Sequence, residues 1–263
     1  MNFEPFVNNS QLFLLIFMRI FAMVQIAPLL SSSAIPQIAK IGLSGFTAIV
    51  IFPMVQKAGY TIPENGLAFG ALILGEIAIG IIIGFFLIIF YTSFLVAGQI
   101  FSMQMGFAAS QVFDPLAQIQ IPIMGQFLNL IAMFVFISIS GFQKLFLIGV
   151  YRSFQSLRAY DFVSQKYHIF KFLFGSLTKL FEQALIISFP ILGTLLLVTV
   201  TMGLLAKAAP QMNLLMLGFP VKIGVAFLLL FLALPFIMEK FVDVINMSFD
   251  EIQVFVTRNG VSG

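Results

Sequence analysis

The hydrophobic positions of this chain gather into long runs, which are separated by short clusters of charged and turn-forming residues. Six such runs cover residues 12–30, 41–55, 67–97, 122–150, 184–206 and 212–238. A helix needs about 20 mostly apolar residues to cross a bilayer, and only the run 41–55 is clearly shorter. The charge-free region from Ile77 to Phe113 is too long for one simple crossing, so we expect irregular structure from Gly98 onward. The pattern predicts an all-α protein with six long apolar helices, or seven.

The composition excludes several classes of protein. Hydrophobic residues make up 60% of the chain and charged residues 9%, against about 45–50% and about 25% in soluble proteins. The mean hydropathy is +1.10. These values argue against a soluble enzyme, a secreted disulfide scaffold and a disordered chain. The net charge of +3 is small and scattered, which argues against a nucleic acid as partner. The first residues carry Glu4 and no basic residue, so we interpret the first run as a retained helix rather than a removable signal.

The polar segments suggest how the helices are connected. The stretch 151–183 is the longest hydrophilic connection and is rich in Lys and Arg. The positive-inside rule places it in the cytoplasm, with both termini on the same side if there are six crossings. After Glu239 the sequence becomes amphipathic, which predicts a helix laid on a partner or a membrane surface, followed by a disordered tail over 257–263. The apolar stripe of this segment consists of Phe241, Val244, Ile245, Phe249, Ile252 and Val256.

Two charged residues interrupt apolar helices. Glu76 lies within the run 67–97, and a carboxylate at membrane depth usually faces protein or water. It is either an ion or proton site or a polar residue that fixes helix packing. Arg19 either pairs with a carboxylate or extends to an interface. Small residues four positions apart, among them Gly80 and Gly84, indicate close packing of the Glu76 helix against another helix.

The most unusual segment runs from Gly98 to Pro115, where amides alternate with Phe and Met before an Asp-Pro break. Irregular polar backbone at membrane depth occurs only where it is buried in protein or lines a wet cavity. A pore lining or plug would have this composition, and so would a surface loop between two helices. The candidate plug residues are Met105, Phe107, Gln111, Val112, Phe113 and Asp114.

Residues with catalytic chemistry are few. The chain has no Cys, and its one histidine, His168, lies in a polar connector without a nucleophile motif. No phosphate-binding loop or metalloprotease motif is present. We therefore expect no enzymatic activity, no catalytic residues, no metal and no cofactor. Lys207, Pro210, Gln211 and Asn213 belong to a tight turn between two helices, and Lys222 is a candidate for an interface or subunit contact.

Several of these segments resemble the FliR family of type III export gates. The resemblance covers nearly the whole chain and is carried by two blocks. The first comprises Gly98-Gln99, Met105-Gly106-Phe107, Val112-Phe113-Asp114-Pro115 and Gly125-Gln126-Phe127-Leu128-Asn129-Leu130. The second and more specific block runs from Gly203 through Lys207-Ala208-Ala209-Pro210-Gln211-Met212-Asn213 to Gly218-Phe219-Pro220-Val221-Lys222.

The resemblance implies an architecture and a set of partners. One FliR-like chain joins about five FliP-like and about four FliQ-like chains around a pore for unfolded flagellar proteins, with an FlhB-like subunit at the cytoplasmic entrance. Residues 1–183 would form a FliP-like part with a pore loop near 103–120. Residues 184–238 would form a FliQ-like hairpin, and residues 239–263 an amphipathic helix and tail.

The resemblance also bears on the location and on rival functions. It places the protein in the bacterial inner membrane at the flagellar basal body, and Glu76, Gly80, Gly84, Lys207, Pro210, Gln211, Asn213 and Lys222 in packing and assembly. The resemblance puts the turn at Lys207 on the cytoplasmic side, whereas the positive-inside rule puts this turn on the opposite side of the membrane. We give the resemblance more weight, because the chain carries few charges on which the rule can act. The alternatives are an injectisome gate subunit of the same architecture and a small-solute transporter that uses Glu76 and Arg19.

Overall fold

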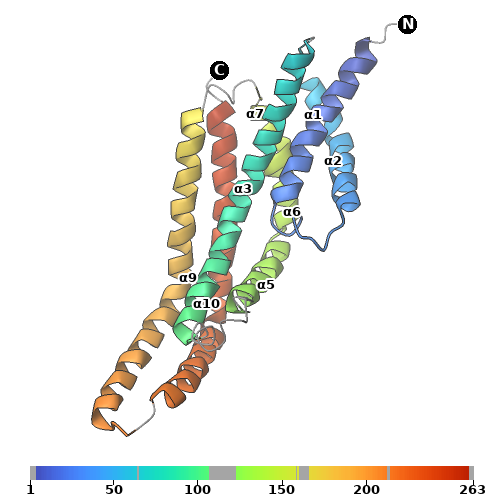
Figure 1. Cartoon of the computed structure of the whole chain (residues 1–263). Helices are drawn as coiled ribbons and strands as arrows, with labels where there is room; N and C mark the ends of the chain where they lie inside the picture. Colours follow the sequence, from blue (N-terminus) through green and yellow to red (C-terminus); the bar gives the residue numbers. More distant parts are fainter. Residues whose placement is uncertain are drawn as a thin grey trace. The chain divides into compact units, whose positions relative to one another are not determined.

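The computed structural model describes residues 4–63, 65–106, 123–157, 159, 166–211 and 214–260. Every regular element in these residues is helical, which confirms the all-α class. In chain order they are α1 (Glu4–Ile26), α2 (Gln37–Lys57), α3 (Gly66–Met105), α5 (Ile123–Ser138), α6 (Gly141–Lys144), the π-helix η1 (Leu145–Arg152), α7 (Ser153–Ser156), α9 (Lys166–Ala208) and α10 (Leu214–Gly260) (Figure 1).

The helices match the expected number of apolar segments. Among the described residues, five helices are long and apolar enough to cross a membrane, or six if α5 and the helical turns that follow it count as one broken span. α3, α9 and α10 are 40, 43 and 47 residues long. At 1.5 Å per residue α3 is about 60 Å long, twice the thickness of a hydrocarbon core. Each long helix is therefore more than one simple crossing.

Several boundaries differ from the sequence expectations. α3 does not become irregular at Gly98 but continues to Met105. The run 122–150 is not one helix: it is broken between Ser138 and Gly141, where Ser140 has a φ of +58°. The polar stretch 151–183 is largely helical, because α9 begins at Lys166.

The expected amphipathic helix after Glu239 is the continuation of α10 to Gly260, so helix extends into the segment expected to be disordered. Its apolar stripe is buried within the chain rather than left for a partner or a membrane surface. The Phe241 ring, for example, packs against Phe94 of α3, with a centroid distance of 4.1 Å.

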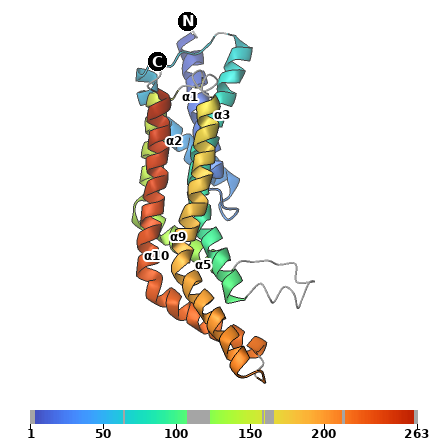
Figure 2. The ribbon, with the colours of Figure 1, turned by 90° about the vertical axis from the view of Figure 1, so that its left-hand side faces the viewer.

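The chain divides into two compact units. The first comprises Met1–Ile89, Ser140–Ser176 and Ile245–Gly263, and within it α1 and α2 lie side by side (Figure 1). The second comprises Phe90–Ile139 and Leu177–Val244, and it contains the end of α9 and the start of α10, shown in orange in Figure 2.

A glycine contact organises the second unit. A Cβ added at Gly98 of α3 would overlap the backbone of Gly125 in α5, so the two helices cross at these glycines. Farther along the two helices, the Tyr91 hydroxyl of α3 donates to the Asn129 carbonyl of α5 over 3.1 Å. Gly98 thus permits close helix packing, which explains why it does not end α3.

Candidate functional site: a buried ion-pair network

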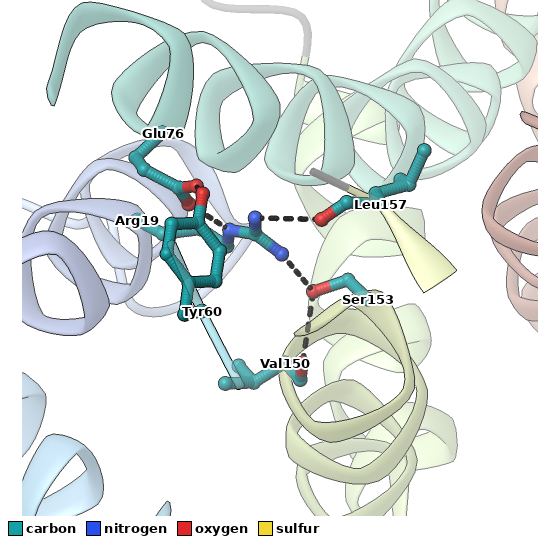
Figure 3. A network of polar contacts seen from close by, with 6 residues as sticks. All are labelled: Arg19, Tyr60, Glu76, Val150, Ser153 and Leu157. Atoms are coloured by element: carbon teal, nitrogen blue, oxygen red, sulfur yellow. Dashed lines mark hydrogen bonds and ion pairs between the residues drawn. The ribbon is translucent and has the colours of Figure 1, made fainter. Parts of the chain in front are cut away.

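The first unit is organised around the side chain of Arg19, which lies in the second half of α1. The residue is 1% exposed, and its neighbours Ile16, Ile20 and Met23 are buried as well. A guanidinium in such surroundings needs partners for its N–H groups, because an unpaired buried charge is strongly destabilising. Figure 3 shows that these partners come from two other parts of the chain, α3 and the segment from Ser153 to Leu157.

The first partner is Glu76 of α3, whose side chain is completely buried. Nε of Arg19 donates to Oε2 of Glu76. The other carboxylate oxygen, Oε1, accepts a hydrogen bond from the Tyr60 hydroxyl, which lies in the connection between α2 and α3. Both oxygens of the buried carboxylate are therefore bound, one by a cation and one by a neutral donor.

The second set of partners follows the π-helix. Nη1 of Arg19 donates to Ser153 Oγ over 3.1 Å, and Nη2 donates to the Leu157 carbonyl over 3.0 Å. Ser153 Oγ in turn donates to the Val150 carbonyl over 2.8 Å, so its remaining lone pairs are available to the guanidinium. The Phe154 ring lies against the guanidinium, 3.8 Å from the carbon Cζ, in a cation–π contact.

The π-helix η1 places these acceptors. It runs over eight residues directly before Ser153, and Gly149 within it packs against Ile83 of α3 and Met23 of α1. A side chain at Gly149 would crowd these neighbours, since an added Cβ would lie 3.1 Å from a methyl of Ile83. π-Helical turns are rare and occur preferentially where a local geometry is required. Here that geometry turns Ser153 and Leu157 toward Arg19.

Small residues on α3 bring α1 within reach of Glu76. A Cβ at Gly80 would overlap the Arg19 carbonyl oxygen, and one at Gly84 would lie 3.1 Å from the Met23 carbonyl. At Gly75 the added atom would lie 2.7 Å from Cβ of Ala159. The α1 backbone therefore lies directly on Gly80 and Gly84 of α3, which is the close helix packing expected of small residues at this spacing.

The network also affects the titration of Tyr60. Burial raises the pKa of the Tyr60 phenol above its ordinary value, and the negative charge of Glu76 raises it further, while Arg19 opposes this shift. The phenol therefore remains a neutral donor to the carboxylate. The chemistry of the site is that of a closed, charge-balanced contact, in which neither oxygen of Glu76 is left for an ion.

The remaining candidate residues lie elsewhere. Met105 is buried at the end of α3 in the second unit, against Phe101 and Met124. Lys207, Pro210 and Gln211 are exposed at the turn between α9 and α10, and Lys222 is half-buried on α10. Phe107, Gln111, Val112, Phe113, Asp114 and Asn213 lie outside the described residues.

Sequence reasoning found two members of the network and missed the others. Of the two interpretations of Arg19, the structure confirms the pairing with a carboxylate, and the partner is Glu76. Tyr60, Ser153 and Leu157 were not predicted. Tyr60 carries the only signal, as an aromatic hydroxyl in a turn close to the helix that bears Glu76, whereas nothing local marks a backbone carbonyl such as that of Leu157.

Comparison with known proteins identifies the family. The family model described as "Bacterial export proteins, family 1" matches residues 10–248, which include every member of the network. The chain belongs to this family. A flagellar biosynthetic protein FliR from Borreliella burgdorferi is 32% identical over 97% of this chain and 94% of its own length. Proteins of the same name from Bacillus subtilis and Escherichia coli are 30% and 26% identical, over 95% and 94% of this chain and 96% and 95% of their own lengths.

The match to the bacterial export proteins extends over most of the described helices. The match covers all of α2, α3 and α9 and the larger parts of α1 and α10, so the resemblance is not confined to one motif. The family match also includes the turn at Lys207 and the residue Lys222.

Proposed function

We propose that this chain is a core subunit of the flagellar type III protein export gate, in the bacterial inner membrane at the flagellar basal body. The observation that carries the proposal is the end-to-end similarity to proteins named flagellar biosynthetic protein FliR. The proposed role is not catalytic: the chain completes and seals a pore that unfolded flagellar proteins traverse.

The exposed apolar surfaces of the long helices indicate that this protein is embedded in an assembly or a bilayer. The most apolar segments of α9 and α10 have only 22% and 17% of their residues buried within the chain. Large apolar side chains such as Phe189 on α9 and Phe231 on α10 are more than two-thirds exposed. Exposed apolar area on this scale is covered by lipid or by partner subunits. We infer FliP-like, FliQ-like and FlhB-like partners, with about five FliP-like and about four FliQ-like copies per chain.

Within this proposal the chain has three parts. Residues 1–183 correspond to a FliP-like part, 184–238 to a FliQ-like hairpin, and 239–263 to a C-terminal helix and tail. Because α9 and α10 are continuous across the two internal boundaries, these parts would share helices rather than be joined by linkers. The exposed turn that contains Lys207, Pro210 and Gln211, with Asn213 and Lys222 beyond it, would contact the neighbouring subunits.

The segment that begins at Met105 supplies the proposed plug. Phe107, Gln111, Val112, Phe113 and Asp114 combine bulky apolar groups with polar groups that tolerate a wet cavity. Met105 itself is buried at the end of α3, which would anchor the segment. Family membership and this composition support the proposal.

The geometry of the buried network weighs against a small-solute transporter. A transport site built on Glu76 needs a carboxylate that exchanges its partner, but both oxygens of Glu76 are bound by side chains of the same chain. An injectisome subunit of the same family is the nearer alternative, and the flagellar names of the relatives favour the flagellar system.

Native mass spectrometry of the tagged full-length chain, extracted in mild detergent from its own host, tests the proposal. A complex with the mass of this chain plus about five and about four copies of two small membrane proteins is the expected result. A monomer or homodimer without such partners would contradict the proposal. Restoration of motility in a host that lacks this chain separates the flagellar system from an injectisome.

A further inference from the structure

A groove of about 320 Å³ lies between α1 and α2 in the first unit. Its lining comes from Asn9, Ser10 and Phe13 of α1 and from Ile49 and Phe52 of α2. Small-ligand pockets have volumes of about 300–1,000 Å³, so this groove is at the lower end of that range. It fits one narrow ligand and cannot enclose a folded partner.

The packing of three stacked rings on α1 explains where the groove lies. Phe13, Phe17 and Phe21 follow one another along the helix, with centroid distances of 6.5 and 5.7 Å. The edge of the Phe17 ring reaches to 4.0 Å from the position of a Cβ on Gly45 of α2, so it occupies the space that this glycine leaves. Phe13 lines the groove one turn earlier in α1.

The two ends of the groove differ in chemistry. At the end formed by the beginning of α1 and the end of α2, Gln56 Nε2 donates to Asn9 Oδ1 over 3.0 Å, beside Ser10. Lys57 follows Gln56 in the last turn of α2 and adds a positive charge at this end. The other lining side chains are all apolar. The groove is therefore polar at one end and apolar along the rest.

The surface around the groove is apolar. Phe46, Val50 and Met54 of α2 are each about half exposed or more, and α1 and α2 are both long and apolar enough to cross a membrane. In the membrane location proposed above, on which this inference rests, the open side of the groove faces acyl chains. Its polar end then lies where α1 begins and α2 ends, near an interface with the headgroups.

From this arrangement we infer that the groove between α1 and α2 binds one acyl chain of a membrane phospholipid, with the headgroup at Asn9, Gln56 and Lys57. A lipid has the same lengthwise order of chemistry, with a polar and anionic head followed by an apolar chain. None of the lining residues is charged, so a charged solute would enter without a counterion there. The Lys57 ammonium attracts a lipid phosphate.

The test uses the full-length chain, with its partner subunits, in vesicles of phosphatidylethanolamine and phosphatidylglycerol that contain a phosphatidylglycerol with a photoreactive acyl chain. Labelled peptides are identified by mass spectrometry. We expect the label to concentrate on Phe13 and Phe52. Ile49→Trp, which fills the groove, should reduce this labelling several-fold. Val50→Trp is the matched control, since Val50 is the next residue, is similarly exposed and does not line the groove.

Three results would overturn the inference. Label spread evenly over the exposed faces of α2 would mean ordinary contact with bulk lipid. Unchanged labelling of Phe13 and Phe52 in a folded Ile49→Trp variant would mean that the groove does not hold the chain. If that variant does not fold, the position of the label in the unsubstituted protein still decides. No label on any helix would also contradict the membrane location in the proposed function, whereas the first two results leave that location intact.

Discussion

The Arg19 guanidinium donates to the Glu76 carboxylate across the contact between α1 and α3, although both side chains are almost completely withdrawn from solvent. A buried ion pair contributes less to net stability than its geometry suggests, because both ions lose their hydration. Here the remaining polar groups of the pair are bound by Tyr60, Ser153 and Leu157. The pair thus fixes how four segments of the first unit meet.

We expect Glu76→Gln to lower the free energy of unfolding by about 3–5 kcal/mol, because it leaves the guanidinium buried without a counterion. The measurement is denaturant unfolding of the purified chain in detergent. The double change Arg19→Met with Glu76→Leu should cost less than the sum of the two single changes, since it leaves no unpaired charge.

An exposed pair provides the control for this prediction. Lys240 donates to Asp243 over 2.9 Å, and both side chains are accessible to solvent. Asp243→Asn should change the free energy of unfolding by less than about 1 kcal/mol, as is usual for surface pairs. An effect of Glu76→Gln as small as that of Asp243→Asn would show that the buried network is not a stabilising centre of the fold.

The raised pKa of the Tyr60 phenol predicts that the free energy of unfolding changes with pH under alkaline conditions. Its pKa is raised by burial and by the Glu76 carboxylate, whereas in the unfolded chain it titrates near its ordinary value of about 10. Above that value the folded state holds the proton longer than the unfolded state. The stabilisation is therefore fully present below pH of about 10 and is lost progressively as the pH rises. Tyr60→Phe should remove this contribution to the pH dependence.

The measurement compares the unfolding free energies of the original chain and Tyr60→Phe between neutral and alkaline pH. At neutral pH the variant should be less stable by about 1.5–3 kcal/mol, because the carboxylate loses a donor. This difference should narrow above pH 10. A constant difference over the whole range would contradict the assignment of the proton to Tyr60.

The proposed plug predicts a change in conductance. Phe107→Ala combined with Phe113→Ala should raise ion leakage through the gate without preventing its assembly, because smaller side chains seal a pore less completely. Conductance of the reconstituted complex in planar bilayers measures the leak, and native mass spectrometry checks the assembly. The matched control is Phe189→Ala, an exposed phenylalanine on α9 outside the proposed plug. Equal conductance in the plug variant and the control would exclude the assignment.

The sequence predicts the helical class and the approximate helices because long apolar runs leave few alternatives. It does not predict the ends of α3 and α9. Gly98 has a low intrinsic helix propensity, but its missing Cβ allows contact with Gly125, and this tertiary contact outweighs the local preference. α9 begins earlier than its apolar run because helix formation does not require an apolar face throughout.

The sequence likewise predicts only part of the buried ion-pair network. The sequence indicates that Arg19 and Glu76 each need a partner, since a charge in an apolar helix is costly alone, but it does not show that the two side chains pair with each other. Their further partners depend on the π-helical turn before Ser153 and on the course of the connection that holds Tyr60. These features arise from packing and leave no periodic pattern in the sequence.

The glycines of α3 provide a paired test of the close approach between α1 and α3. At Gly80 a Cβ would overlap the Arg19 carbonyl oxygen, so Gly80→Ala requires the α1 backbone to move. We expect a loss of about 1–3 kcal/mol in the free energy of unfolding, as for other overpacked contacts. At Gly70 of the same helix nothing lies within 4 Å of an added Cβ. Gly70→Ala should therefore stabilise the chain by about 0.5–1 kcal/mol through helix propensity alone. Effects of the same sign at both positions would mean that α1 does not lie directly on Gly80. A loss of stability for Gly80→Ala together with a gain for Gly70→Ala would also show where the loss comes from. Only the Gly80 change displaces the α1 backbone that positions Arg19 opposite Glu76.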